Sequence, residues 1–233
     1  MSLSRRVDPE WLDRLPADNP RAVRSRRDLK RVNSVMLQTG LMARALLAHG
    51  TLPRTIIDLG CGDGTFMLGV ARWLSARWPG VAVTLLDRQN IVAARTVAAF
   101  EALGWTARPV AADLFEFMAR AAPVDIIVAN LVLHHFDAPR LGELLARAAQ
   151  RADLVVACEP RRSRFGLFGS RMLWAIGCND VTRHDAAISV RAGFHGRELS
   201  ALWPAHEPWI LHEGAAGPFS HRFVAHRQAG RAA

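Results

Sequence analysis

The stretch Ile56-Ile57-Asp58-Leu59-Gly60-Cys61-Gly62-Asp63-Gly64-Thr65 decides the fold of this 233-residue chain. An apolar run typical of a buried strand reaches a carboxylate, Asp58, and three glycines then alternate up to Gly64. Alternate glycines let the backbone turn tightly and approach a ligand closely, and such turns lie at the carboxyl ends of strands in open α/β sheets. A dinucleotide fingerprint would instead space its glycines as GxGxxG. Asp58 would also repel a pyrophosphate and attract an ammonium group.

Short apolar runs and helical stretches alternate along the chain from Arg54 onward. The expected strands are Arg54–Gly60, Val81–Asp87, Trp105–Ala112, Val124–Asn130 and Asp153–Glu159. The expected helices are Thr65–Trp78, Asn90–Leu103, Leu114–Ala121 and Pro139–Arg151. This alternation is typical of a parallel sheet covered by helices. Glu207–Glu213 and Ser220–Arg227 leave no room for a crossover helix between them, so they predict an antiparallel hairpin at the sheet edge.

The sequence D-L-G-C-G-D-G-T over residues 58–65 resembles motif I of the class I S-adenosylmethionine-dependent methyltransferases. The resemblance covers residues 54–227 and implies a Rossmann-like, doubly wound, mostly parallel seven-stranded sheet with a C-terminal antiparallel hairpin. It implies S-adenosylmethionine as cofactor and S-adenosylhomocysteine (SAH) as product. Residues 51–233 would form the donor-binding domain, residues 1–50 a helical lid, and residues 161–184 an insertion.

The resemblance also assigns the residues that hold the donor. Asp87 corresponds to the acidic residue that accepts hydrogen bonds from both ribose hydroxyls, a feature that NAD enzymes share. Asp113 corresponds to the carboxylate that contacts the adenine amino group, and its position also suits a helix N-cap. Asn130 closes the fourth strand, where relatives contact the methionine moiety through the backbone. The expected donor-binding set is Asp58, Gly60, Cys61, Gly62, Thr65, Asp87, Arg88, Asp113, Leu114 and Asn130.

Two adjacent histidines follow the fourth strand, in the segment 131–136, L-V-L-H-H-F. The segment resembles the L-H-H sequence of small-molecule methyltransferases, in some of which a histidine here acts as a base. An imidazole can assist an acceptor hydroxyl such as a phenol, whose pKa is near 10. His135 and His134 are therefore the candidate catalytic residues; the alternative is that they hold the loop by hydrogen bonds, which we favour for His134. No metal site is predicted, because spacing places no third ligand beside them.

The net charge of +9 raises the possibility of a nucleic-acid substrate. The basic residues are nearly all arginines spread along the chain, and only residues 21–31 concentrate them, in the pattern of a solvated helix face. Enzymes that methylate exocyclic base nitrogens usually carry N/D-P-P-Y/F after the fourth strand, and Asn130–Leu133 lacks it. The expected acceptor is an oxygen of an aromatic or polyketide-like small molecule. The alternatives are an RNA methyltransferase, a nicotinamide-dependent oxidoreductase, or a non-catalytic S-adenosylmethionine-binding protein.

Two flanking segments carry further expectations. Asp8-Pro9-Glu10 and Asn19-Pro20 each predict the start of a helix, and we expect residues 1–50 to fold over bound donor. His184 and Asp185, at the end of the insertion, are candidates to reach the site, and the alternative for Asp185 is that it caps the helix that follows. The arginines and aromatics after Glu159-Pro160 suit either an aromatic acceptor with an acidic group or a loop whose aromatics pack onto the domain; they are Arg161, Arg162, Arg164, Phe165, Phe168, Met172 and Trp174.

The cysteines and the apolar runs argue against a disulfide-rich, metal-binding, membrane-spanning or secreted protein. The three cysteines have no metal-ligand or disulfide spacing, and Cys61 and Cys158 are expected to be small buried side chains. No apolar run approaches the length of about 20 residues that spans a bilayer, and the first residues lack the apolar region of a signal peptide. The sequence thus predicts a cytoplasmic protein and leaves the oligomeric state open.

Overall fold

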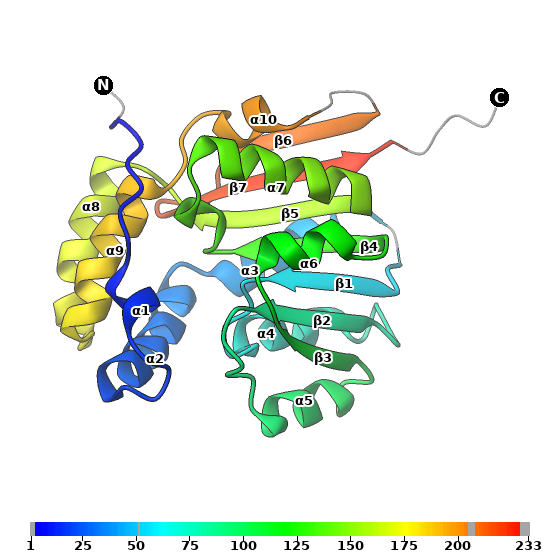
Figure 1. Cartoon of the computed structure of the whole chain (residues 1–233), viewed down its shortest axis with the longest axis horizontal. Helices are drawn as coiled ribbons and strands as arrows, with labels where there is room; N and C mark the ends of the chain where they lie inside the picture. Colours follow the sequence, from blue (N-terminus) through cyan, green and yellow to red (C-terminus); the bar gives the residue numbers. More distant parts are fainter. Residues whose placement is uncertain (1–2, 51, 205–207, 229–233) are drawn as a thin grey trace.

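The computed structural model describes residues 3–50, 52–204 and 208–228. One seven-stranded sheet has the order β3-β2-β1-β4-β5-β7-β6, in which the first five strands of the chain run parallel and β7 is antiparallel to both neighbours (Figure 1). The strands are β1 (Thr55–Leu59), β2 (Ala82–Asp87), β3 (Thr106–Ala111), β4 (Val124–Asn130), β5 (Ala152–Pro160), β6 (Trp209–Ala215) and β7 (Ser220–Arg227). The predicted parallel sheet with a terminal hairpin is confirmed. The expected strand Glu207–Glu213 begins at Trp209, and Glu207 lies outside the described residues.

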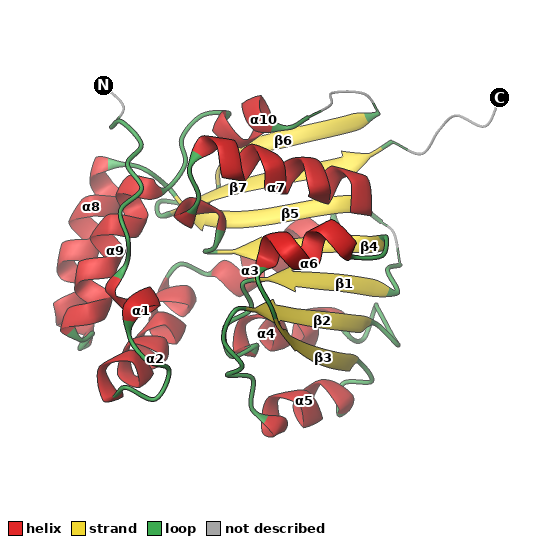
Figure 2. Cartoon of the chain, viewed as in Figure 1, coloured by secondary structure: helices red, strands yellow, loops and turns green. Residues whose placement is uncertain are grey.

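Helices cover both faces of the sheet (Figure 2). One face packs against α3 (Gln38–Leu47), α4 (Thr65–Leu74) and α5 (Ala94–Glu101), and the other against α6 (Leu114–Arg120), α7 (Ala138–Arg151) and α10 (Glu198–Leu202). Neighbouring strand residues point to opposite faces, so Ile56 belongs to the first core and Ile57 to the second. Burial on both faces explains why the central strands read as continuous apolar runs.

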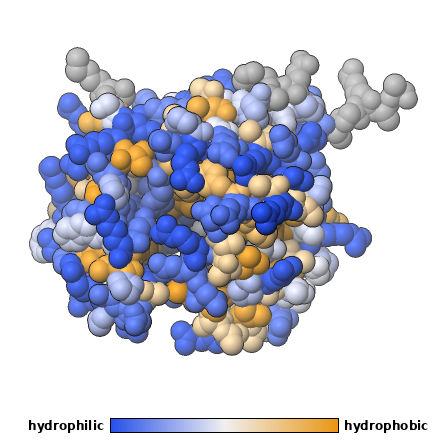
Figure 3. Space-filling model, viewed as in Figure 1, coloured by the Kyte–Doolittle hydropathy of each residue, from blue (hydrophilic) through white to orange (hydrophobic). Residues whose placement is uncertain are grey.

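The remaining helices form a cap beyond the carboxyl ends of the parallel strands, at the left of Figure 1. It consists of α1 (Trp11–Arg14), α2 (Pro20–Val35), α8 (Arg164–Arg171), the 3-10 helix η2 (Met172–Ile176) and α9 (Asp180–Ala192). α9 packs against α1, α2 and α8, so the N-terminal segment and the insertion after β5 meet in one body. The outward surface of the cap in Figure 3 is mainly hydrophilic, with scattered hydrophobic residues.

Capping residues in the sequence predicted two helix starts correctly, whereas other helix bounds differ from expectation. Asn19 accepts a hydrogen bond from the Arg21 amide at 2.9 Å, and Asp113 caps α6 from the Phe115 amide at 2.8 Å, both as predicted. The helix expected to reach Trp78 ends at Leu74. The helix expected from Asn90 begins only at Ala94, and its N-cap residue is extended.

Asp185 and Asp28 differ from expectation. Asp185 lies inside α9 and accepts hydrogen bonds from the amides of Trp11 and Leu12, both at 2.9 Å. It therefore caps α1 across the cap rather than a helix that follows it. Asp28, expected on a solvated face of α2, is buried because it accepts a hydrogen bond from the Asn179 amide at 2.7 Å. Among the described helices, none has the length and apolar content needed to cross a membrane.

Candidate functional site

The glycine turn between β1 and α4 depends on its glycines. Gly60, Gly62 and Gly64 all have positive φ, at 66°, 56° and 73°, where other residues are strained. A Cβ on Gly60 would also lie 2.6 Å from Cγ2 of Val132, so the loop after β4 leaves no space for a side chain there. The turn and the histidine loop are thus packed against each other.

A cavity of about 340 Å³ lies between this turn, the loop after β4 and the cap. Several predicted site residues line it, from both the turn and the loop: Asp58, Gly60, Cys61, Gly62, Thr65, Asn130, His134 and His135. The cap contributes apolar walls through Leu29 and Val32 of α2, Met36 directly after that helix, and Leu173 of η2. The structure therefore brings the two halves of the predicted site together around one space.

Four predicted donor-binding residues lie beside this cavity rather than in its wall: Asp87, Arg88, Asp113 and Leu114. Asp87 and Asp113 follow the adjacent strands β2 and β3, at the same edge of the sheet as the turn. Asp87 accepts hydrogen bonds from the Gly62 amide at 2.9 Å and from the Gln89 amide at 2.8 Å. Asp87 therefore holds the turn in shape.

Among the described residues, three buried acceptors that line the cavity have no hydrogen-bond partner: Oδ1 of Asn33, Oδ2 of Asp58 and Oδ1 of Asn130. The last two lie at the carboxyl ends of the adjacent strands β1 and β4. Burial, together with the nearby Asp87 carboxylate, raises the pKa of Asp58 to about 8. An unpaired buried carboxylate is costly, and a cationic ligand would remove that cost by pairing with it. The two acceptors therefore fit a ligand group rich in N–H donors, such as an ammonium.

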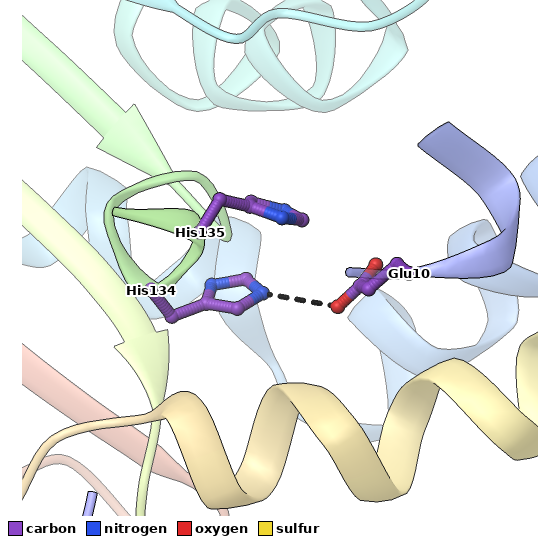
Figure 4. Close-up of side chains that lie close together, drawn as sticks. All are labelled: Glu10, His134 and His135. Atoms are coloured by element: carbon purple, nitrogen blue, oxygen red, sulfur yellow. Dashed lines mark ion pairs between the residues drawn. The ribbon is translucent and has the colours of Figure 1, made fainter. Parts of the chain in front are cut away.

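His134 is a buried member of an ion-pair chain (Figure 4). Its Nδ1 lies 2.7 Å from Oε2 of Glu159, and its Nε2 lies 3.5 Å from Oε1 of Glu10. Burial alone would lower the pKa of His134, but hydrogen bonds to Glu10 and Glu159 raise it to about 9. Burial acts against ionisation of Glu10 as well, yet its hydrogen bond and charge interaction with His134 lower its pKa to about 2. The two carboxylates keep the His134 ring charged and fixed, which suits a structural role.

Glu159 holds the histidine loop and is not part of the cavity wall. Its carboxylate is fully buried and accepts hydrogen bonds from the amides of Val132 at 3.0 Å and Leu133 at 2.9 Å. These bonds fix a loop in which Leu131 has a positive φ of 55°, an uncommon conformation for a leucine.

His135 differs from its neighbour because its side chain is 26% exposed and lines the cavity. Its ring lies beside that of His134, with centroids 4.2 Å apart, and its Nδ1 lies 3.4 Å from Oδ2 of Asp13 (Figure 4 shows the two rings). Burial and the charge of His134 lower the pKa of His135, so its imidazole is neutral at neutral pH.

Sequence reasoning missed Glu10 and Asp13, which reach the site from the N-terminal segment. The only signal was a pair of acidic residues at the start of a short predicted helix, far from the histidines in sequence. Glu10 supplies the third potential metal ligand that spacing did not place, since its ligand atom and those of His134 and His135 all lie within 4.8 Å of one another. Both ring nitrogens of His134 already face carboxylates, so this group is balanced as an ion pair.

The N-terminal segment is held over the site by specific contacts. Arg5 donates to the carbonyl of Phe136 at 2.8 Å, and the Trp11 ring stacks on His184 with centroids 3.7 Å apart. His184 is thus a packing partner of α1 and is not part of the cavity wall. Lys30 of α2 pairs with Asp63 of the glycine turn at 2.7 Å.

The aromatic residues of the insertion do not line the cavity, and Phe165 packs onto the domain by stacking on Phe219, with ring centroids 5.2 Å apart. Phe165, Phe168 and Trp174 are exposed, and so is Met172. Arg162 is instead buried and pairs with Glu198.

Comparisons with known proteins agree with the fold. The family model of a methyltransferase domain matches residues 56–152, whereas no curated protein matches the chain. The structure of the plantazolicin methyltransferase BpumL in complex with SAH aligns over 91% of this chain and 92% of its own, with 14% identity and a TM-score of 0.65. The mitomycin 7-O-methyltransferase MmcR aligns over 94% of this chain and 60% of its own, with 20% identity and a TM-score of 0.62.

A third structure, the magnesium protoporphyrin IX methyltransferase ChlM from Synechocystis PCC 6803 with bound SAH, aligns over 83% of both chains, with 15% identity and a TM-score of 0.54. At these identities the structural likeness shows the fold alone, and the match to the methyltransferase-domain model runs from Ile56 in β1 to Ala152, the first residue of β5. The match over residues 56–152, the seven-stranded architecture and the glycine turn together agree with a class I S-adenosylmethionine-dependent methyltransferase domain.

Proposed function

We propose that this methyltransferase transfers a methyl group to an oxygen of a small aromatic or polyketide-like acceptor. One observation carries the proposal: a single cavity is lined both by the unpartnered carboxylate of Asp58 and by the neutral imidazole of His135. The first suits the ammonium of the donor, and the second suits the hydroxyl proton of an acceptor.

The donor would lie along the carboxyl edge of β1, β2, β3 and β4. Asp58 would accept hydrogen bonds from its ammonium group, and the glycine turn with Cys61 and Thr65 would pack against it. Beyond the cavity wall, Asp87 with Arg88 would meet the ribose, and Asp113 with Leu114 the adenine. When bound, S-adenosylmethionine supplies a methyl group on a sulfonium, which is already activated for displacement. The protein mainly aligns the two reactants and excludes water.

The acceptor would occupy the part of the cavity that the cap encloses. Its walls are apolar there, through Leu29, Val32 and Leu173, which favours an aromatic or aliphatic body over a charged one. If the N–H at Nδ1 of His135 donates a hydrogen bond to Asp13, Nε2 carries no proton and can take that of an acceptor hydroxyl. The imidazolium of His134 beside it opposes protonation of His135 and keeps that base available.

The alternative of an RNA substrate rests on the net charge of +9 alone. The cavity is enclosed by apolar cap residues, and the loop after β4 lacks the base-methylating motif. The neighbours BpumL and MmcR are named for plantazolicin and mitomycin, which supports a small-molecule acceptor.

The decisive experiment is transfer of tritiated methyl from S-adenosylmethionine into an extract of the producing cells, with and without ribonuclease. We expect label in solvent-extractable small molecules, unaffected by ribonuclease, and a loss of about 100-fold or more with His135→Ala. The matched control is His195→Ala, an exposed histidine outside the cavity wall, which should keep most of the activity. Label that enters RNA would overturn the assignment of the acceptor.

A further inference from the structure

Large apolar side chains stand exposed in one short stretch of the cap. Within residues 161–176, Phe168 is 59% and Trp174 61% exposed, far more than a packed side chain would be. Phe165, Phe168 and Met172 follow a helical spacing of three and four residues, so they share one face. We call this group the α8 patch; its members are Phe165, Phe168, Met172, Trp174 and Ile176. Contiguous exposed apolar patches mark interaction sites on soluble proteins.

The charged residues of the segment that carries the α8 patch have one sign. Residues 161–176 contain four arginines and no aspartate or glutamate. Arg164 and Arg171, at the two ends of α8, are exposed beside the apolar face. A basic helix with phenylalanine and tryptophan on its apolar face is typical of segments that lie in the interface of an anionic membrane.

The opposite face of the same segment lines the cavity. Gly166, Gly169, Ser170 and Leu173 belong to the cavity wall, while the α8 patch faces outward. α8 is therefore a wall one helix thick between the exposed patch and the space proposed for the acceptor. Val35, at the end of α2, also lines the cavity and is 59% exposed, so the cavity has an apolar rim on a second element.

We propose that the α8 patch docks this enzyme peripherally on an anionic membrane surface, so that an apolar acceptor dissolved in the bilayer reaches the cavity past α8. A bilayer fits better than a protein partner because bulky apolar side chains with flanking arginines need no complementary shape there. The route of the acceptor rests on the proposed function, whereas the docking itself does not.

The experiment is flotation of the full-length protein with vesicles of equimolar phosphatidylglycerol and phosphatidylcholine, and with vesicles of phosphatidylcholine alone. We expect the protein to float with the anionic vesicles and much less with the neutral ones. The double variant Phe168→Ser/Trp174→Ser should lower the partition coefficient by about tenfold or more, because each buried aromatic side chain contributes substantially. Arg164→Gln/Arg171→Gln should also lower it and weaken its dependence on salt.

The matched control is Trp73→Ser on α4, a tryptophan that is 54% exposed on another part of the surface, and its partition should equal that of the wild type. Circular dichroism and S-adenosylmethionine affinity check that all variants fold. Absence of wild-type flotation, or equal losses in the patch and control variants, overturns the proposal. The proposal is also overturned if the wild type is a dimer and the patch variants are monomers, because the patch would then join two copies of the chain. Flotation without small-molecule methylation would instead refute the proposed function alone.

Discussion

Asp58 lies in β1 just before the glycine turn and has a buried oxygen without a hydrogen-bond partner, so its replacement tests the donor site most directly. Replacing it with asparagine keeps the size and removes the charge. We expect Asp58→Asn to weaken S-adenosylmethionine binding by about tenfold or more, because hydrogen bonds to charged groups contribute about 1.5–3 kcal/mol. Isothermal titration calorimetry measures the change. Asp63→Asn is the matched control, because that carboxylate in the same turn already pairs with Lys30; equal affinities in both variants and wild type would refute the role of Asp58.

The Glu10–His134 pair makes stability depend on pH in two windows. The folded pKa of His134, about 9, lies above its unfolded value of 6.5, so its contribution is complete below pH 6.5 and is lost as pH rises toward 9. The folded pKa of Glu10, about 2, lies below its unfolded value of 4.5, so its contribution is complete above pH 4.5 and is lost as pH falls toward 2. We expect the free energy of unfolding, measured by urea titration, to be highest between these windows.

The matching variant is Glu10→Gln, which keeps the shape and removes the charge. Its free energy of unfolding should vary less between pH 6.5 and 9 than that of the wild type, because His134 loses one of the two carboxylates that raise its pKa. An unchanged pH dependence would show that Glu159 alone holds the imidazolium.

At the scale of elements, the short helix α1 brings a carboxylate to the proposed base. Asp13→Asn removes the charge that faces Nδ1 of His135 at 3.4 Å, so the ring loses its orientation and its preferred tautomer. We expect kcat to fall by about tenfold or more with little change in KM. The pH dependence of kcat should shift as well, because the coupled charges around His135 change. A lower Tm with unchanged kcat and pH profile would assign Asp13 a purely structural role.

The sequence predicted elements well where their signals were local. The strands β1 to β5, the glycine turn and the caps at Asn19 and Asp113 all follow from neighbouring residues, because periodicity and capping act over a few positions. Glu10 reaches His134 only because α9 holds α1 over the site through Asp185. That contact joins three segments distant in sequence, so no spacing rule could reveal it. The exposure of the apolar face of α8 was not predicted for the same reason, because the packing of this helix depends on the whole cap.

At the scale of the whole molecule, the cap and the sheet meet around the donor site, and this predicts a response to the donor. Asn33 and Lys30 of α2 line the same cavity as the glycine turn, so bound S-adenosylmethionine would contact both bodies. A ligand that binds only the folded state stabilises it by about 2.7 kcal/mol at 100 times its Kd. We expect a higher Tm and slower tryptic cleavage at the exposed arginines Arg24 and Arg27 when the donor is present. Lys30→Ala should reduce the protection because it removes the contact with Asp63. Cleavage of α2 at the same rate with and without the donor, while Tm rises, would show that the cap does not fold over it.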